Sequence, residues 1–108
     1  MFMMGFNSPY FDGMYALETL YMTRNDPEGV FNYGLYSNPE LDAAIRAARD
    51  ETDLRRREEL LRAAWRRVTQ EMIYIPMYNQ VLVWAMRRNV DAVLRPDNWF
   101  EIRWARVN

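Results

Sequence analysis

The sequence of 108 residues contains no cysteine, no histidine and no lysine. Without cysteine there is no disulfide, no thiolate nucleophile and no cysteine-based zinc site. Without histidine there is no Ser–His–Asp triad and no imidazole for proton transfer. The four glycines form no loop that would cradle a phosphate. We therefore expect a protein that is not an enzyme and that carries no cofactor and no metal.

The absence of lysine leaves arginine as the sole cation, with 14 basic residues against 15 acidic ones and a net charge of −1. A nearly neutral chain gives no electrostatic reason to bind nucleic acid or an anionic membrane. Two basic runs, Arg55–Arg57 and Arg66–Arg67, have the composition of a nucleic-acid patch. Interleaved glutamates neutralise them, so we interpret both runs as a solvated helix face.

Hydrophobic residues make up 50% of the chain, and four Trp, seven Tyr and five Phe make it rich in aromatics. This composition is typical of a folded chain, and the length is enough for one domain. No stretch is long enough to span a bilayer. The apolar run Met1–Phe6 predicts a buried strand, and because it lacks a basic region and a cleavage site it is not a signal peptide. A domain that begins inside a buried strand is expected to belong to something larger.

Apolar residues at helical spacing predict three helices. The first is Phe11–Met22, with Asp12 near its start. The second opens at Ser37–Glu40, where Ser37 and Glu40 fit a capping box, and is followed by a longer helix capped by Thr52–Asp53 that runs to about Met72. The expected buried stripes are Met14, Leu17, Leu20 and Tyr21; then Leu41, Ala44, Ile45 and Ala48; then Leu54, Leu61, Ala64, Trp65, Val68 and Met72. The expected ion pairs are Asp42–Arg46, Arg46–Asp50, Arg55–Glu59, Glu58–Arg62 and Arg67–Glu71.

Three further segments have the pattern of strands. Ile73–Tyr78 contains Pro76 and is therefore expected at a sheet edge or bulge. Val81–Met86 is a second strand, and strict alternation over Trp99–Val107 predicts a half-buried third. The fold class is accordingly α/β, with a pair of helices packed on a small mixed sheet that includes Met1–Phe6 and Ile73–Tyr78.

Several short sequence motifs resemble those of one known family. Asn32–Asp42 (NYGLYSNPELD) is similar to a segment of the family 5 extracellular solute-binding proteins, which serve ABC importers of peptides, nickel and opines. Arg57 with Leu61 resembles the family's "R-x-x-L" helix. Ile75–Tyr78 resembles its "I-P-L-Y" strand, and Arg88–Val90 resembles the turn that precedes a crossing between lobes. The resemblance covers nearly the whole chain, and the order and spacing of these motifs make it specific.

The resemblance implies a C-terminal portion of a two-lobed, periplasmic-binding-protein-like (type II) fold. Residues 1–95 would belong to the second lobe, and residues 96–108 would form a return strand that rejoins the first lobe. It also implies a small-molecule or peptide ligand enclosed between lobes and an ABC permease as partner. The parent protein would be periplasmic, or extracellular and lipid-anchored.

The same resemblance suggests ligand-binding residues. Gly5–Phe6 matches the family's "G-W" pair, which implies that Phe6, Asn7 and Ser8 line the ligand cleft; the alternative is a core Phe beside an ordinary turn. Asp12 would hold a cationic ligand group, or it is simply a carboxylate at the start of a helix. Tyr10 would offer an amphipathic contact in the binding mouth, or it is a half-buried aromatic, and the same pair of interpretations applies to Tyr15, Tyr33 and Tyr36.

A second hypothesis belongs to a different class. If the last strand lacks its sheet, its apolar edge should recruit a partner. The chain would then be a self-associating structural or interaction module, expected as a homodimer or a higher oligomer with its C-terminal strand paired or exchanged.

Overall fold

The computed structural model describes residues 3–10 and 12–108. These residues form two compact units. The helical unit is Tyr10–Ile75, and the terminal unit combines residues 3–9 with Pro76–Asn108. The predicted boundary between residues 95 and 96 falls inside the terminal unit.

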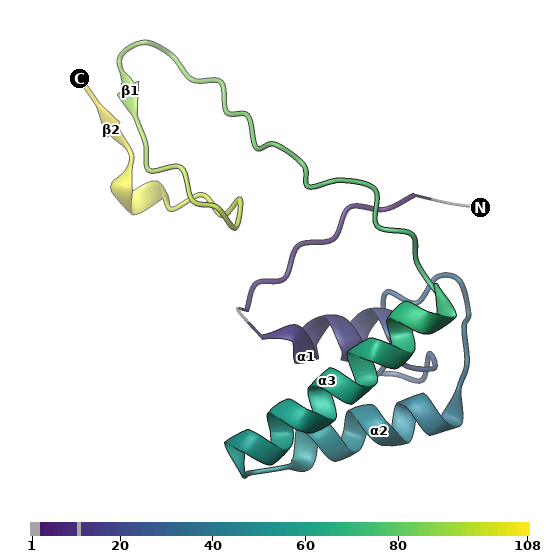
Figure 1. Ribbon diagram of the computed structural model, residues 1–108. Coiled ribbons are helices and arrows are strands. Elements are labelled where there is room, and N and C mark those ends of the chain that lie inside the picture. The colour runs from purple at the N-terminus through teal and green to yellow at the C-terminus, as the bar shows by residue number, and fades with distance from the viewer. Residues whose placement is uncertain (1–2, 11) are drawn as a thin grey trace. The chain divides into compact units, whose positions relative to one another are not determined.

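Helices build the helical unit. The first helical stretch is α1 (Gly13–Ala16), which continues as the π-helix η1 (Leu17–Tyr21). The others are α2 (Pro39–Asp50) and α3 (Leu54–Glu71), which run antiparallel as a helical hairpin (Figure 1). α1 and η1 pack against this hairpin. The three predicted helices are confirmed, although Phe11 lies outside the described residues.

The start of α2 differs from the capping box expected at Ser37. Asn38 is the N-cap, and its Oδ1 accepts hydrogen bonds from the backbone N–H groups of the next turn, including that of Glu40 at 3.1 Å. Pro39 occupies the first helical position, which places the residue just before it at the cap. The Ser37 hydroxyl instead lies 3.0 Å from the hydroxyl of Thr23.

Asp53 caps the start of α3, and its carboxylate accepts the N–H of Arg56 at 2.8 Å; Met72 caps the end in the left-handed region with φ 50°. The predicted apolar stripe is wrong at both ends, because Leu54 and Met72 are 80% and 64% exposed. α3 has 18 residues and α2 has 12, so α3 is longer than the helix with which it pairs.

The core lies where α1, η1 and the hairpin meet. The predicted shared core is confirmed, since Leu41, Ile45 and Val68 are buried together and Leu61 and Trp65 pack against them. The remaining buried members are Met14, Leu17, Met22, Ala48 and Ala64. The sheet that was expected beneath the helices is absent from the described residues, and α1 and η1 take its place.

The loop between η1 and α2 is held by buried polar groups. Asn32 is fully buried and its Nδ2 donates to the carbonyls of Met22 and Tyr36 at 2.9 and 2.7 Å. Asp42, also buried, accepts the backbone N–H of Thr23 at 2.9 Å. Gly29 has φ 62°, and a Cβ there would lie 2.4 Å from the carbonyl oxygen of Met22, so the tight turn requires glycine.

Some arginines bind carboxylates other than those expected from helical spacing. Arg46 binds Glu28 through two hydrogen bonds of 3.1 and 2.5 Å, in place of the predicted partners on α2, because the loop places that carboxylate over α2 while Asp42 turns inward. Arg49 reaches the same carboxylate at 3.3 Å. On α3, Arg62–Glu58 and Arg67–Glu71 are confirmed, whereas Glu59 pairs with Arg56 and not with Arg55.

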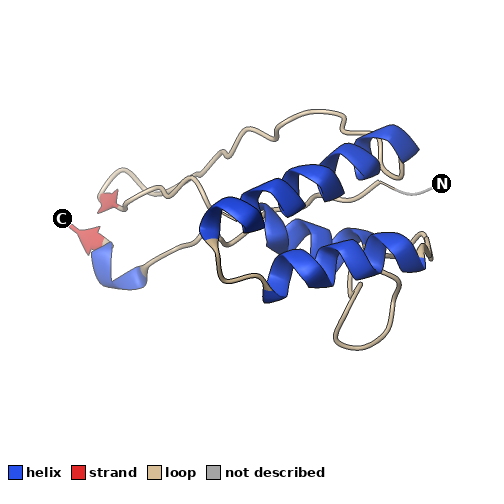
Figure 2. Cartoon of the chain, turned by 60° about the horizontal axis from the view of Figure 1, so that its bottom comes forward, coloured by secondary structure: helices blue, strands red, loops and turns tan. Residues whose placement is uncertain are grey.

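The terminal unit is mostly extended chain. Its sheet has two short antiparallel strands, β1 (Val90–Asp91) and β2 (Arg106–Val107), drawn red in Figure 2, with Val90 opposite Val107. The turn predicted at Arg88–Val90 leads into β1. A 3₁₀ turn, η2 (Ile102–Trp104), interrupts the segment predicted as the third strand.

The other predicted strands are wrong as well. Residues 3–6, 73–78 and 81–86 belong to no ladder, and residues 1–2 lie outside the described part. Alternating apolar residues define which side chains share a face, but a strand also needs a neighbour to pair with. The described residues supply that neighbour only at β1 and β2, so the molecule is mixed helical with a small two-stranded sheet.

Candidate functional site

Three of the residues predicted to bind ligand lie in the terminal unit. Phe6, on extended chain, is 36% exposed and is therefore not the core residue of the alternative interpretation. Asn7 is exposed, and its Nδ2 donates a 2.7 Å hydrogen bond to the backbone carbonyl of Asp97. Ser8 is half-buried. Their role in ligand binding stays a prediction.

The backbone carbonyl that accepts from Asn7 belongs to Asp97, whose side chain makes further hydrogen bonds. The guanidinium of Arg95 binds both carboxylate oxygens of Asp97, and the backbone N–H of Trp99 donates to Oδ1 at 3.1 Å. The hydrogen bond with Arg95 is the main reason why the pKa of Asp97 lies below its ordinary value. Because Asp97 stays charged and paired, the turn that carries its carbonyl is a defined support for Asn7.

Tyr10 and Asp12 lie in the helical unit. Tyr10 is 62% exposed, and its ring stacks edge-on against that of Tyr15 with centroids 5.4 Å apart. Asp12 is the N-cap of α1: its Oδ1 accepts the N–H of Met14 at 2.9 Å, and its Oδ2 binds Nη2 of Arg57 at 2.7 Å. These two hydrogen bonds hold the pKa of Asp12 below its ordinary value. The helix-capping interpretation of Asp12 is thus confirmed.

The remaining tyrosines considered as binding residues have structural contacts. The Tyr36 hydroxyl donates to Glu71, which ties the loop before α2 to the end of α3. Tyr33 is exposed and lies under the guanidinium of Arg24, 5.9 Å from the ring centroid. Both contacts lie within the helical unit.

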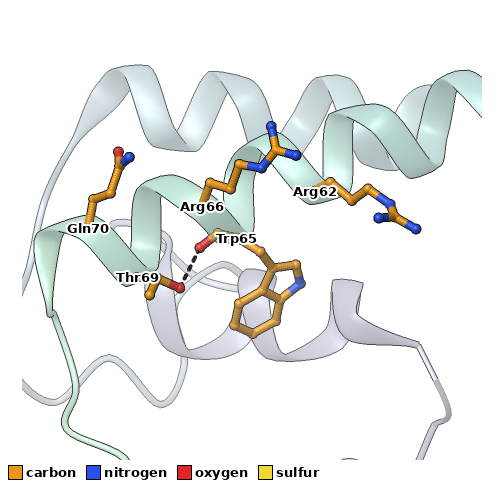
Figure 3. Close-up of a pocket in the computed structure, with 5 residues that line it drawn as sticks. All are labelled: Arg62, Trp65, Arg66, Thr69 and Gln70. Atoms are coloured by element: carbon orange, nitrogen blue, oxygen red, sulfur yellow. Dashed lines mark hydrogen bonds between the residues drawn. The ribbon is translucent and has the colours of Figure 1, made fainter.

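A hollow on α3 was not predicted as a site from the sequence. Its volume is about 520 Å³, and its lining residues all come from one face of that helix, as Figure 3 shows: Arg62, Trp65, Arg66, Thr69 and Gln70. The Thr69 hydroxyl donates to the backbone carbonyl of Trp65 at 2.9 Å, and Arg62 is paired with Glu58. The spacing of three and four residues would have placed these side chains together, but it also fits an ordinary solvated helix face.

A second hollow of about 440 Å³ lies in the terminal unit around the two short strands. It is lined by Asp91, Ala92, Val93, Arg103, Trp104 and Arg106. Across residues 3–10 and 12–108 no acidic side chains gather into a group able to hold a metal ion. In the same part of the chain, none of the helices is both long enough and apolar enough to cross a membrane.

The chain is similar in sequence to curated proteins that share one name. The chain is 30% identical over 101 residues to the glutathione-binding protein GsiB of Salmonella paratyphi A, and equally so to the proteins of that name from Escherichia coli K12 and Shigella flexneri. Each match covers 93% of this chain and 20% of the relative. The chain therefore spans about a fifth of the length of these curated relatives. No family model and no solved structure matches it.

Proposed function

We propose that this chain is part of the ligand-binding component of an ABC importer for peptides or similar small solutes, of the family 5 solute-binding kind, and that it corresponds to the C-terminal portion of such a protein. The observation that carries the proposal is the match over 93% of the chain to proteins named for binding glutathione. The parent protein would work in the periplasm or on the outer cell surface, would pass its solute to a permease, and would catalyse no reaction.

The structural role of the motif residues supports the family assignment. Within Asn32–Asp42, Asn32 and Asp42 hold the loop by buried hydrogen bonds, Asn38 caps α2, and Leu41 is fully buried. The resemblance therefore falls on residues that shape the helical unit. Their structural role supports the proposal of a shared fold, and other positions would determine which solute is bound.

The ligand-lining role is proposed for the segment that precedes α1. Phe6 offers an exposed ring for stacking on a solute, and Asn7 and Ser8 offer polar groups beside it. Tyr10, which lies in the helical unit and is exposed, is proposed as a separate aromatic contact for the solute. Apolar surface with a few convergent polar groups is the usual composition of a small-solute site.

The test is calorimetric titration of the full polypeptide that carries this sequence, with reduced glutathione and then with a set of di- and tripeptides. We expect saturable binding to at least one of them and weaker binding by the Phe6→Ala variant. Val83→Ala is the matched control, because that apolar side chain is 86% exposed in the same unit and outside the proposed site. A folded protein that binds none of these solutes, or equal losses in both variants, would contradict the proposal.

A further inference from the structure

The hollow of about 440 Å³ around β1 and β2 is lined by two arginines that no role described so far uses. Arg103 comes from η2, and Arg106 comes from β2. Trp104 stands between them in the chain and is 47% exposed. All the lining residues belong to the terminal unit, so the hollow lies within one unit. Its volume is within the range of small-solute sites.

The guanidinium of Arg106 has no carboxylate bound to it. Across residues 3–10 and 12–108, the ion pairs do not include Arg106. Asp91 stands opposite it in the ladder and would be the ordinary cross-strand partner. That carboxylate instead accepts a 2.7 Å hydrogen bond from Nδ2 of Asn108. Arg103 differs, because it binds Glu101 at 3.1 Å. The donors of Arg106 are therefore available to a bound group.

The rest of the lining determines which group would suit this guanidinium. Ala92, Val93 and Trp104 supply apolar surface, and Val93 is 51% exposed. The planar fork of an arginine matches the two oxygens of a carboxylate, and apolar neighbours strengthen such a pair relative to open water. Asp91 in the same lining disfavours a group of higher negative charge, such as a phosphate. A carboxylate on a short apolar stem fits all of these residues.

We propose that this hollow is a site for a carboxylate of the solute, in which Arg106 binds the carboxylate oxygens and Trp104 and Val93 contact the apolar stem. Arg103 adds a second positive charge at the same hollow. The inference rests on the proposed function and names the chemical class of solute, which is one with a free carboxylate. It also gives a binding role to a part of the chain whose sequence pattern predicted only a half-buried strand.

The test compares two solutes on the full polypeptide that carries this sequence. Calorimetric titration measures the affinity for reduced glutathione and for its diester, in which the carboxylates are neutral. We expect glutathione to bind about fivefold more tightly than the diester, as suits an exposed ion pair. Arg106→Gln should abolish this preference by weakening the binding of glutathione alone. Arg106→Lys should keep part of it, because lysine retains the charge and lacks the planar fork.

Arg87→Gln is the matched control. Arg87 is an exposed arginine of the same unit, precedes β1 and does not line the hollow, so its substitution makes the same change in net charge. We expect this variant to keep the full preference for glutathione. An equal loss of preference in Arg87→Gln and Arg106→Gln would mean that net charge attracts the solute, and it would overturn the carboxylate site.

The remaining outcomes distinguish this inference from the proposed function. A variant that failed to fold would lose affinity for both compounds, whereas the expected result leaves the binding of the diester intact. Equal affinity of the unaltered protein for glutathione and for its diester would overturn the carboxylate site and leave the proposed function standing. Binding of neither compound would also overturn the carboxylate site, and the proposed function would then depend on the wider series of peptides.

Discussion

Asn32 satisfies three backbone groups of the loop between η1 and α2 at once. Its amide donates to the carbonyls of Met22 and Tyr36 and accepts the N–H of Tyr36 at 3.1 Å, and the side chain is fully buried. Asn32→Ala leaves these groups without partners, and we expect it to lower the free energy of unfolding by about 2–3 kcal/mol. Urea unfolding measures this, with the exposed Asn25→Ala in the same loop as control. A loss no larger than that of the control would show that water replaces the side chain.

Tyr74 is the opposite case, because its buried hydroxyl has no hydrogen-bond partner among the described residues. Burial raises the pKa of this hydroxyl. Tyr74→Phe removes an unsatisfied polar group, and we expect stability to stay the same or to rise by up to about 1 kcal/mol. Tyr36→Phe is the matched control, and it should destabilise because that hydroxyl donates to Glu71. Thermal melts of both variants check the contrast, and a clear loss in Tyr74→Phe would reveal an unseen partner.

Among the helices, the packing of α3 on η1 depends on Trp65. Its ring meets that of Tyr21 edge-on at 5.6 Å and lies against Gly13 of α1. Because the side chain is half-buried, we expect Trp65→Ala to cost about 3 kcal/mol, near the lower end for large aromatic truncations. Leu54→Ala on the exposed start of the same helix should cost little. An unchanged thermal midpoint for Trp65→Ala would mean that this face of α3 is not the packed one.

Carboxylates that bind groups on neighbouring elements are expected to make stability depend on pH in the acid range. Hydrogen bonds from Arg46 and from Tyr36 are the leading causes that hold the pKa values of Glu28 and Glu71, respectively, below the ordinary 4.5. A carboxylate whose pKa is lower in the folded state stabilises the protein above its ordinary pKa, and that contribution is lost as the pH falls through the folded value. We expect the free energy of unfolding to be level down to about pH 5 and to decline below it.

Urea titrations at a series of pH values test this expectation. Glu28→Gln should flatten the decline, since the altered side chain no longer takes up a proton. Glu59→Gln, which removes one carboxylate from an exposed pair on α3, is the matched control. An equal slope in all three proteins would show that Glu28 does not cause the decline in the free energy of unfolding at acid pH.

The elements show what the sequence could and could not predict. Helical periodicity located all three helices and the shared core, since a helix satisfies its own backbone and needs only an apolar face. The cap at Asn38 follows from Pro39 at the first helical position, a local signal that the capping-box prediction at Ser37 missed. The Arg46–Glu28 pair depends on the path of a loop, which local patterns do not encode. The strand predicted at Trp99–Val107 is kept only at Arg106–Val107, and the other predicted strands failed, because alternation carries no information about a pairing partner. Of the proposed site, the sequence anticipated the helix cap at Asp12 but not its bond to Arg57.

At the scale of the whole molecule, the terminal unit leaves many apolar side chains in contact with water. Val81, Val83 and Trp99 are 79%, 86% and 64% exposed, on chain that pairs with no strand in the described residues. Extended apolar chain with unpaired backbone groups recruits partners. We expect the chain of 108 residues, on its own, to form a homodimer or a higher oligomer through this unit. Light scattering at micromolar concentration measures it, and a monomer with quenched Trp99 fluorescence would refute the expectation.

The way the two units divide the chain has a consequence for how the protein is made. The helical unit is one continuous stretch, Tyr10–Ile75, so all its contacts are available as soon as residue 75 has left the ribosome. The terminal unit cannot begin so early, because Asn7 bonds to a residue 90 positions further along. Contacts between distant residues form late, after the loop between them has closed. During synthesis the three helices can therefore form first. Residues such as Asn7 form their contacts only after the C-terminal part of the chain has been made.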